Sequence, residues 1–225
     1  MKFAGIMKNS TVDYPGKIVA TLFTGGCNFR CEYCHNSSLI NAKQIEEWIE
    51  ESEVFQYLDK RKKVLDGICI TGGEPSLYSA EIVEFVKKVK KRYGYDFLVK
   101  IDSNGSNPEF IEKVCGYVDY IALDYKSLDY SGFSRCSLRT IEESIEKLKK
   151  KAEYEIRITM YPEYIREEDF NKIAYNLKGV RKVAIQQFKP ENVFIDKGIL
   201  PYSIEVLEKF KKVMEREGIE VEIRK

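Results

Sequence analysis

Short runs of consecutive apolar residues alternate along this chain with longer segments in which apolar residues recur at helical spacing. Six runs rich in β-branched and other apolar side chains predict strands at residues 17–23, 67–71, 97–101, 118–123, 156–160 and 183–188. Helical patterns between them predict helices at residues 42–60, 80–91, 140–151, 167–177 and 203–217. Residues 219–223 alternate between apolar and acidic side chains, which predicts a short edge strand.

A further helix is predicted from its start signal. Asn107 is a residue type that caps helices, Pro108 suits the first turn, and Glu109 places an acid at the positive end of a helix. We therefore expect a helix to begin at Asn107.

The alternation of strands and helices predicts an α/β fold. Parallel strands joined through a helix are connected by right-handed crossovers, so the strands form a parallel sheet. Six or so units are too few for a closed eight-stranded barrel, which leaves an open partial barrel or a doubly wound sheet. In both folds the site lies where the carboxyl ends of the strands meet. No linker-like segment divides the sequence, so we expect a single domain over residues 1–225.

Charge and hydropathy limit the classes of function. The chain has 37 Lys and Arg and 36 Asp and Glu residues, so its net charge of +1 gives no reason to expect a nucleic-acid partner. No apolar run reaches the length of a membrane span, and residues 1–6 lack an apolar signal core. We expect a cytoplasmic protein, because a reducing compartment suits thiols that are not in disulfides.

Cys27, Cys31 and Cys34 form a C-x3-C-x2-C pattern, which is the most specific feature of the chain. A cubic iron–sulfur cluster normally takes four cysteine ligands, so three would leave one iron open to a substrate or cofactor. Zinc with His35 as a fourth ligand is an alternative, although adjacent side chains rarely both reach one small ion. A second alternative is that the three cysteines are thiols without a metal-binding role. Disulfides do not suit a long chain without a signal peptide.

A glycine turn follows the second predicted strand. Gly72 and Gly73 have no side chains, so their backbone can approach a ligand closely. Glu74 adds a carboxylate that can hold an ammonium group. The competing interpretation is a tight turn into a helix that begins near Pro75.

Polar residues also stand at the ends of later strands. Asp102 ends the third strand and is not explained by the Asn-Gly turn that follows it. Asp124 and Lys126 share a face if the fourth strand continues, with a surface ion pair as the competing interpretation. Arg157 and Gln187 lie in or beside apolar runs and either face the site or point to solvent at an edge.

Together these motifs resemble the radical S-adenosylmethionine enzymes. The order and spacing of the cysteine loop with His35-Asn36, residues 71–75, residues 102–105 and residues 124–126 are similar to those of glycyl-radical-enzyme activases. Residues 10–17, 60–67 and 186–190 most resemble the long form of the activase of anaerobic ribonucleoside-triphosphate reductase. The resemblance covers nearly the whole chain. Ser37 and Lys189 depart from the proline and arginine expected at their positions.

The resemblance implies an open partial (β/α)6 barrel with outer helices, and a [4Fe–4S] cluster on Cys27, Cys31 and Cys34. The open iron would bind S-adenosylmethionine, and an electron from the cluster would cleave it to a 5′-deoxyadenosyl radical that takes a hydrogen atom from a glycine of the partner. The implied cofactor-binding residues are Tyr33, Cys34, His35, Gly72, Gly73, Glu74, Asp102, Asp124, Lys126, Arg157 and Gln187.

The implied partner is a glycyl radical enzyme, in the first place anaerobic ribonucleoside-triphosphate reductase. A low-potential donor such as flavodoxin or ferredoxin would reduce the cluster, and neither a membrane nor a nucleic acid is expected. The alternatives are activation of another enzyme such as pyruvate formate-lyase, a radical enzyme acting on a small molecule or RNA, and a non-catalytic zinc or iron–sulfur protein.

Overall fold

The computed structural model describes residues 1–150 and 153–225, which divide into two compact units. Unit 1 comprises Met1–Asn28, Ser38–Ser103 and Glu112–Ile121, and unit 2 comprises Phe29–Ser37, Asn104–Ile111 and Ala122–Lys225. The single domain expected over residues 1–225 stays a prediction. Within the described residues, no helix is long and apolar enough to cross a membrane.

The strands of unit 1 form a mostly parallel set in the order β6-β5-β3-β2. Strands β3 (Val19–Thr24), β5 (Gly67–Gly72) and β6 (Leu98–Ser103) are parallel, and β2 (Gly5–Ser10) pairs with β3 antiparallel. The residues of β5 from Gly67 to Ile70 are buried in succession, as expected for a parallel strand covered on both faces. A small second sheet pairs β1 (Lys2–Phe3) with β4 (Ile49–Glu50).

Unit 2 contains the order β10-β9-β8-β7. These strands are β7 (Tyr120–Asp124), of which residues 122–124 belong to unit 2, β8 (Tyr154–Thr159), β9 (Lys182–Gln186) and β10 (Glu220–Arg224). β8, β9 and β10 pair in parallel. The prediction of a last edge strand at residues 219–223 is therefore confirmed.

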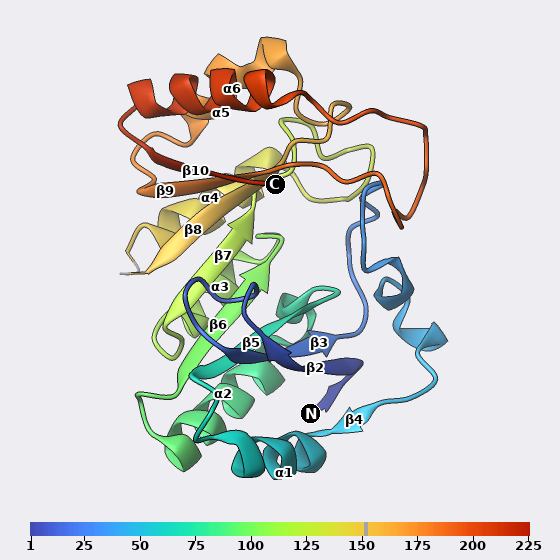
Figure 1. The fold of residues 1–225 in the computed structure, drawn as a ribbon, viewed down its shortest axis with the longest axis vertical. Coiled ribbons are helices and arrows are strands. Elements are labelled where there is room, and N and C mark those ends of the chain that lie inside the picture. The colour runs from blue at the N-terminus through green and yellow to red at the C-terminus, as the bar shows by residue number, and fades with distance from the viewer. Residues whose placement is uncertain (151–152) are drawn as a thin grey trace. The chain divides into compact units, whose positions relative to one another are not determined.

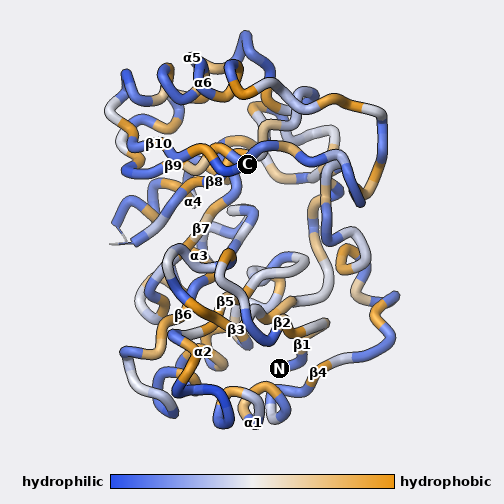
Figure 2. Tube along the Cα trace, in the orientation of Figure 1, coloured by the Kyte–Doolittle hydropathy of each residue, from blue (hydrophilic) through white to orange (hydrophobic). Residues whose placement is uncertain are grey.

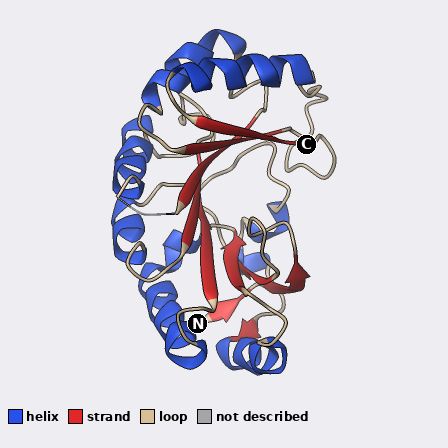
Figure 3. Ribbon diagram, turned by 60° about the vertical axis from the view of Figure 1, so that its left-hand side comes forward, coloured by secondary structure: helices blue, strands red, loops and turns tan. Residues whose placement is uncertain are grey.

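Each of six parallel strands is followed by an α-helix (Figure 1). The helices are α1 (Glu51–Arg61), α2 (Ser79–Tyr93), α3 (Pro108–Val114), α4 (Leu138–Leu148), α5 (Phe170–Asn176) and α6 (Ile204–Arg216). Figure 3 distinguishes these helices, in blue, from the strands, in red. Among the described residues the strand order ends at β2 and β10, and these two strands do not pair with each other, which confirms the α/β fold with six strand–helix units and no closed barrel.

The helices pack through the apolar positions that the sequence pattern picked out. Helix α4 buries Ile141, Ile145 and Leu148, three or four residues apart on one face. The rings of Phe170 in α5 and Phe210 in α6 stack with centroids 4.2 Å apart. Figure 2 shows the alternation of hydrophobic and hydrophilic positions along these two helices. Asn107 caps α3 as expected, since its Oδ1 accepts a hydrogen bond from the backbone N–H of Phe110 at 3.0 Å.

One predicted helix is wrong. Residues 42–60 do not form a continuous helix: a 3₁₀ turn at Ala42–Gln44 and strand β4 come before α1, which starts at Glu51. A Cβ atom added to Gly25 would fall within 2.6 Å of both Ile45 and Trp48. The apolar residues of this segment therefore pack on the backbone of Gly25, and tertiary packing overrides the helical pattern.

The other boundaries differ by smaller amounts, and the strands β1, β2 and β4 were not predicted. The helix predicted at residues 140–151 runs over Leu138–Leu148, and Lys151 lies outside the described residues. The helix predicted at 167–177 begins as a 3₁₀ turn at Glu167–Asp169 and continues as α5. Strand β2 was not predicted, because its sequence has few β-branched residues and it is held by pairing with β3.

Candidate functional site

The first cysteine of the loop follows directly from strand β3 in unit 1. The chain leaves the strand at Thr24 and passes through Gly25 and Gly26 to Cys27. Gly26 has a positive φ of 82°, which favours glycine. The backbone N–H groups of Gly26 and Cys27 donate to the carbonyl oxygens of Leu39 and Ile40 at 2.7 and 3.1 Å. Backbone contacts within unit 1 therefore fix the position of Cys27.

The glycine turn after β5 packs against the same segment. The N–H of Gly73 donates to the carbonyl of Thr24, and the N–H of Glu74 donates to the carbonyl of Gly26, both at 2.8 Å. A Cβ atom on Gly73 would lie 1.9 Å from the oxygen of Gly26, and one on Gly72 would lie 2.5 Å from the nitrogen of Thr24. Both glycines are thus required by backbone packing inside unit 1, in line with the tight-turn interpretation.

Glu74 is a buried carboxylate that caps a helical turn. Its Oε1 accepts hydrogen bonds from the backbone N–H of Ser76 at 3.0 Å and the hydroxyl of Ser103 at 2.8 Å. The Ser76 bond makes Glu74 the N-cap of the 3₁₀ helix Pro75–Tyr78, in which Pro75 occupies the first turn. The Ser103 bond ties the turn to the end of β6. The local geometry thus matches the competing interpretation, a tight turn into a helix that begins near Pro75, and the cofactor-binding role of Glu74 stays a prediction.

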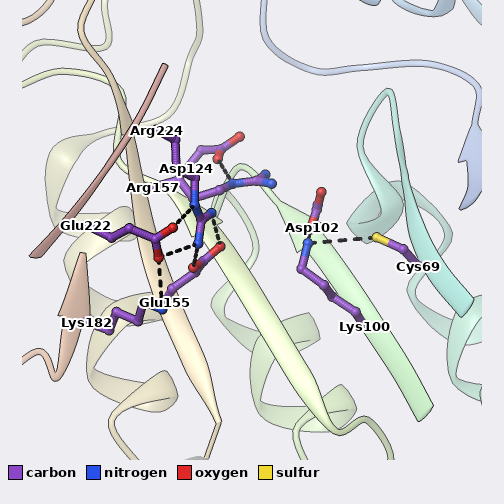
Figure 4. A network of polar contacts seen from close by, with 9 residues as sticks. All are labelled: Cys69, Lys100, Asp102, Asp124, Glu155, Arg157, Lys182, Glu222 and Arg224. Atoms are coloured by element: carbon purple, nitrogen blue, oxygen red, sulfur yellow. Dashed lines mark hydrogen bonds and ion pairs between the residues drawn. The ribbon is translucent and has the colours of Figure 1, made fainter. Parts of the chain in front are cut away.

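Asp102 forms a buried ion pair with Lys100 on the same face of β6 (Figure 4). Lys100 is only 2% exposed, and its Nζ also lies 3.9 Å from the sulfur of Cys69 on β5. A lysine is rarely buried unless it is paired. Sequence reasoning singled out Asp102 and missed Lys100, although their spacing of two in a strand places them on one face.

The other two cysteines belong to unit 2. The backbone N–H of Cys34 donates to the carbonyl of Cys31 at 3.1 Å, which makes the segment a turn. Two aromatic side chains of the loop anchor it. The ring of Phe29 packs against Tyr130 and Phe133 with centroids 5.9 and 5.8 Å away. Burial raises the pKa of the Cys34 thiol.

Tyr33 is the second aromatic anchor. Its ring contacts Tyr161 and Tyr164 at centroid distances of 5.2 and 5.5 Å, and the Nζ of Lys126 lies 5.6 Å from its centroid. Burial raises the pKa of Tyr33 well above its usual value. In the part of the chain that the structure describes, its hydroxyl is the one buried side-chain oxygen or nitrogen without a hydrogen-bond partner.

Three charges meet at the ends of β7 and β8. One oxygen of Asp124 lies 2.8 Å from Nε of Arg157, and the other lies 3.1 Å from Nζ of Lys126. Asp124 and Lys126 meet, but β7 ends at Asp124, so the strand does not continue to Lys126 and a shared strand face is not what pairs them. Arg157 also contacts Asp124. Burial alone would raise the pKa of Asp124, but the two cations outweigh it and lower this pKa to about 2. Asp124 also holds the pKa of Lys126 above its ordinary value against the opposing effect of burial.

The last two predicted residues lie near the loop between β9 and α6. Nε2 of His35 lies 3.0 Å from the carbonyl oxygen of Lys189, where it can donate a hydrogen bond. Nε2 of Gln187 donates to the carbonyl of Tyr202 at 2.9 Å. Both side chains therefore contact backbone within unit 2.

The donor set suits an iron–sulfur cluster. All six cysteines of the chain are thiols. Among the described residues, no three His, Cys, Asp or Glu side chains are grouped to hold a single metal ion. In a cubic cluster each cysteine binds a different iron atom, so the ligands need not share one ion. The three thiols of the cysteine loop therefore fit a cluster by their chemistry.

Comparisons with known proteins agree with this chemistry. Residues 21–174 match the sequence profile of the Radical SAM superfamily. A protein of Methanocaldococcus jannaschii named as a glycyl-radical enzyme activating enzyme is 35% identical over 202 residues, which cover 85% of this chain and 81% of that protein. The pyruvate formate-lyase-activating enzyme of Clostridium pasteurianum is 26% identical over 190 residues, covering 80% of this chain and 77% of that enzyme.

A solved structure shows a similar fold. The structure of native anSMEcpe with bound AdoMet superposes with a TM-score of 0.64 at 18% identity, and the match covers 89% of this chain and 62% of that chain. At this identity the likeness concerns the fold, and it agrees with six strand–helix units in an open sheet.

Proposed function

The chain belongs to the radical SAM superfamily and, within it, to the glycyl-radical enzyme activating enzymes, and from this premise we propose that it generates a glycyl radical on anaerobic ribonucleoside-triphosphate reductase. The observation that supports the formation of a glycyl radical on a partner is the similarity to an activating enzyme over 85% of the chain. The protein is an enzyme of this class, and the superfamily uses a [4Fe–4S] cluster and S-adenosylmethionine. Its partner is a glycyl radical enzyme.

The proposed cluster ligands are Cys27, Cys31 and Cys34. When bound, the cluster supplies the electron that cleaves S-adenosylmethionine and so provides the radical that removes a hydrogen atom from glycine. The chain's own residues place the three thiols. Cys27 is held by backbone hydrogen bonds in unit 1, and Cys34 is held by its bond to Cys31 in unit 2. Phe29 and Tyr33 keep the loop against an aromatic cluster.

We assign cofactor binding in unit 2 to the charged group and to Tyr33. Lys126 and Arg157 both contact the carboxylate of Asp124, and cationic side chains of this kind suit a carboxylate of the cofactor. The buried hydroxyl of Tyr33 has no hydrogen-bond partner among the described residues, and buried polar groups are normally satisfied. A polar group of a bound molecule would satisfy it. Cys34, His35 and Gln187 are proposed to complete this part of the site.

In unit 1 we assign cofactor binding to Gly72, Gly73, Glu74 and Asp102. Glu74 and Asp102 are buried carboxylates, and Ser76 and Ser103 hold the Glu74 carboxylate in one orientation. A fixed buried carboxylate suits the ammonium group of an amino acid such as the methionine part of the cofactor. The carboxylate of Asp102 forms its ion pair with the buried Lys100.

The identity of the partner rests on local sequence resemblance. Residues 10–17 and 186–190 favour anaerobic ribonucleoside-triphosphate reductase, whereas the match to a pyruvate formate-lyase-activating enzyme favours that second partner equally. We further propose a flavodoxin or ferredoxin as the electron donor and a cytoplasmic location. Both follow from the need for a low-potential reductant and reduced thiols.

The test is an anaerobic assay with the reconstituted protein, a reductant and S-adenosylmethionine. The host's class III ribonucleotide reductase and its pyruvate formate-lyase are added separately, and electron paramagnetic resonance detects the glycyl doublet. A doublet on the reductase alone supports the proposal. A doublet only on the lyase replaces the reductase by the second partner. Cofactor cleavage without a doublet on either enzyme would overturn glycine as the substrate.

A further inference from the structure

Glu32 lies between Cys31 and Cys34, and all of its polar positions are bonded to residues far away in the sequence. Its backbone N–H lies 3.4 Å from the hydroxyl of Tyr164, and its backbone carbonyl accepts from the N–H of Ile195 at 2.9 Å. One carboxylate oxygen accepts from the hydroxyl of Tyr161 at 3.0 Å, and the other pairs with Nζ of Lys197 at 2.7 Å. An ordinary solvated glutamate on a loop would make few of these contacts.

Two of these partners belong to one segment, residues 187–203, which we call the strap. It joins β9 to α6 without helix or strand and is the orange-to-red loop of Figure 1. The strap contacts the cysteine loop at Lys189 through His35, at Ile195 through the Glu32 carbonyl, and at Lys197 through the Glu32 carboxylate. The strap and residues 29–37 all lie in unit 2.

The contacts of Glu32 restrict the cysteine loop itself. A peptide group is planar, so fixing the N–H of Glu32 fixes the plane that it shares with Cys31. Fixing its carbonyl fixes the plane that it shares with Tyr33. The side chain of Glu32 is 19% exposed and that of Lys197 is 40% exposed, so their ion pair is only partly shielded from water. The relative placement of Cys31 and Cys34 therefore depends on the four partners of Glu32.

We infer that Glu32 is a positioning residue that fastens the strap to the cysteine loop and thereby sets the spacing of Cys31 and Cys34 for the cluster. The fastening stands on the contacts alone, whereas its role in cluster binding rests on the proposed function. Glu32 is not a ligand in this inference and touches no substrate. It acts through the two cysteines beside it.

The first measurement is hydrogen exchange on the protein without cluster. Glu32→Ala removes both carboxylate contacts, so amide exchange is expected to rise about tenfold in residues 29–37 and in the strap. Lys197→Ala removes the ion pair with Glu32 and a second ion pair with Glu163 at 3.2 Å, so the increase is expected in the strap and beside Glu163, but not in residues 29–37. Glu32→Gln keeps an acceptor for Tyr161 and leaves the Glu163 pair in place, so its increase is expected in the strap. Adding Glu32→Gln to Lys197→Ala should change little, because Lys197→Ala already removes the ion pair with Glu32.

The matched control is Lys2→Ala. Lys2 pairs with Glu50 at the same distance of 2.7 Å, but this pair is exposed and both of its residues belong to unit 1. It should leave exchange in residues 29–37 and 187–203 unchanged. If Glu32→Ala matches this control, the fastening is wrong. If Glu32→Ala fails to fold, Glu32→Gln and Lys197→Ala still test the fastening. It is wrong if neither variant raises amide exchange in the strap above that of the control.

The second measurement follows the cluster in the reconstituted proteins. Glu32→Ala is expected to release iron to a chelator about tenfold faster than the parent and to alter the electron paramagnetic resonance spectrum of the reduced cluster. Glu32→Gln should recover most of the parent behaviour. If Glu32→Ala raises amide exchange but leaves the rate of iron release and the spectrum of the cluster unchanged, the positioning role is wrong. A parent protein that takes up no cluster at all would refute the proposed function and leave the fastening intact.

Discussion

At the scale of single residues, Gly73 is constrained by the backbone of a neighbouring turn. A Cβ atom at this position would meet the carbonyl oxygen of Gly26 at 1.9 Å, and a backbone atom cannot move aside as a flexible side chain can. Gly73→Ala is therefore expected to lower the free energy of unfolding by about 1–3 kcal/mol in urea denaturation. Gly116→Ala is the matched control, because a Cβ atom there meets nothing within 4 Å. Equal stability of the two variants would contradict the packing argument.

The lowered pKa of Asp124 predicts that the stability of the folded protein depends on pH. Its pKa in the folded protein is about 2, below the value near 3.9 of an unfolded chain. A lowered pKa stabilises the folded state at pH values above the unfolded pKa, and this contribution is lost as the pH falls through the folded pKa. The difference in unfolding free energy between the parent and Asp124→Asn is thus expected to shrink by on the order of 2 kcal/mol between pH 5 and pH 2.

Urea titrations at several pH values measure this difference. Glu168→Gln is a suitable control, because its carboxylate is 76% exposed and its nearest cation is 3.8 Å away. A difference for Asp124→Asn that stays constant down to pH 2 would show that the cations do not hold its pKa low.

Patterns in the sequence identified some residues of the candidate site and missed others. The spacing of two residues drew attention to Asp124 and Lys126, which do pair, although β7 ends at Asp124 and Lys126 reaches it from the residues after the strand. Lys100 was missed because a lysine inside an apolar run reads as a solvent-facing position, whereas the ion pair with Asp102 lets it be buried. Glu32 was missed because its partners lie more than 120 residues away, and no local pattern encodes them.

At the scale of elements, strand β10 is fastened by the charges in Figure 4. Arg224 forms two hydrogen bonds of 2.9 and 2.7 Å with Glu155 of β8, whose side chain is 1% exposed. Arg224→Ala removes this bidentate partner from a buried carboxylate and is expected to destabilise the protein by about 3 kcal/mol. Thermal or urea unfolding measures the loss. Arg216→Ala, at an exposed position in α6, should change stability by less than about 0.5 kcal/mol.

Elements were predictable where local preference and tertiary packing agreed. Strand β5 and helix α4 have sequences that suit both their backbone and their buried faces. The helix predicted at residues 42–60 is wrong because Ile45 and Trp48 pack against Gly25 rather than along one face of a helix. Strand β2 was not predicted because pairing with an antiparallel strand, and not its own composition, holds it in the sheet.

At the scale of the whole molecule, cofactor binding is expected to appear as added stability. A ligand that binds only the folded protein stabilises it by about 2.7 kcal/mol at a concentration of one hundred dissociation constants. S-adenosylmethionine should therefore raise the unfolding temperature of the protein with its cluster. Cys31→Ala should abolish this increase, because the cofactor needs the open iron. An equal increase in the variant would show that binding does not depend on the cluster.

The fold class was predictable from the count of strand–helix units, since six cannot close an eight-stranded barrel. The division into two compact units was not, because each unit is assembled from three separate stretches of sequence. Contacts between distant segments decide such a division, and periodicity reports only on neighbours along the chain.

The residues that hold the cysteine loop come late in the sequence, so they are synthesised well after the cysteines. Tyr161 and Tyr164, which hold Glu32, follow it by 129 and 132 residues, and Lys197 comes later still. A chain leaves the ribosome from its N-terminus, so the cysteines emerge long before the residues that order them. We expect that iron and sulfide enter only after synthesis has passed Lys197. Stalled nascent chains that end before this residue should retain no iron under anaerobic conditions, whereas longer ones should.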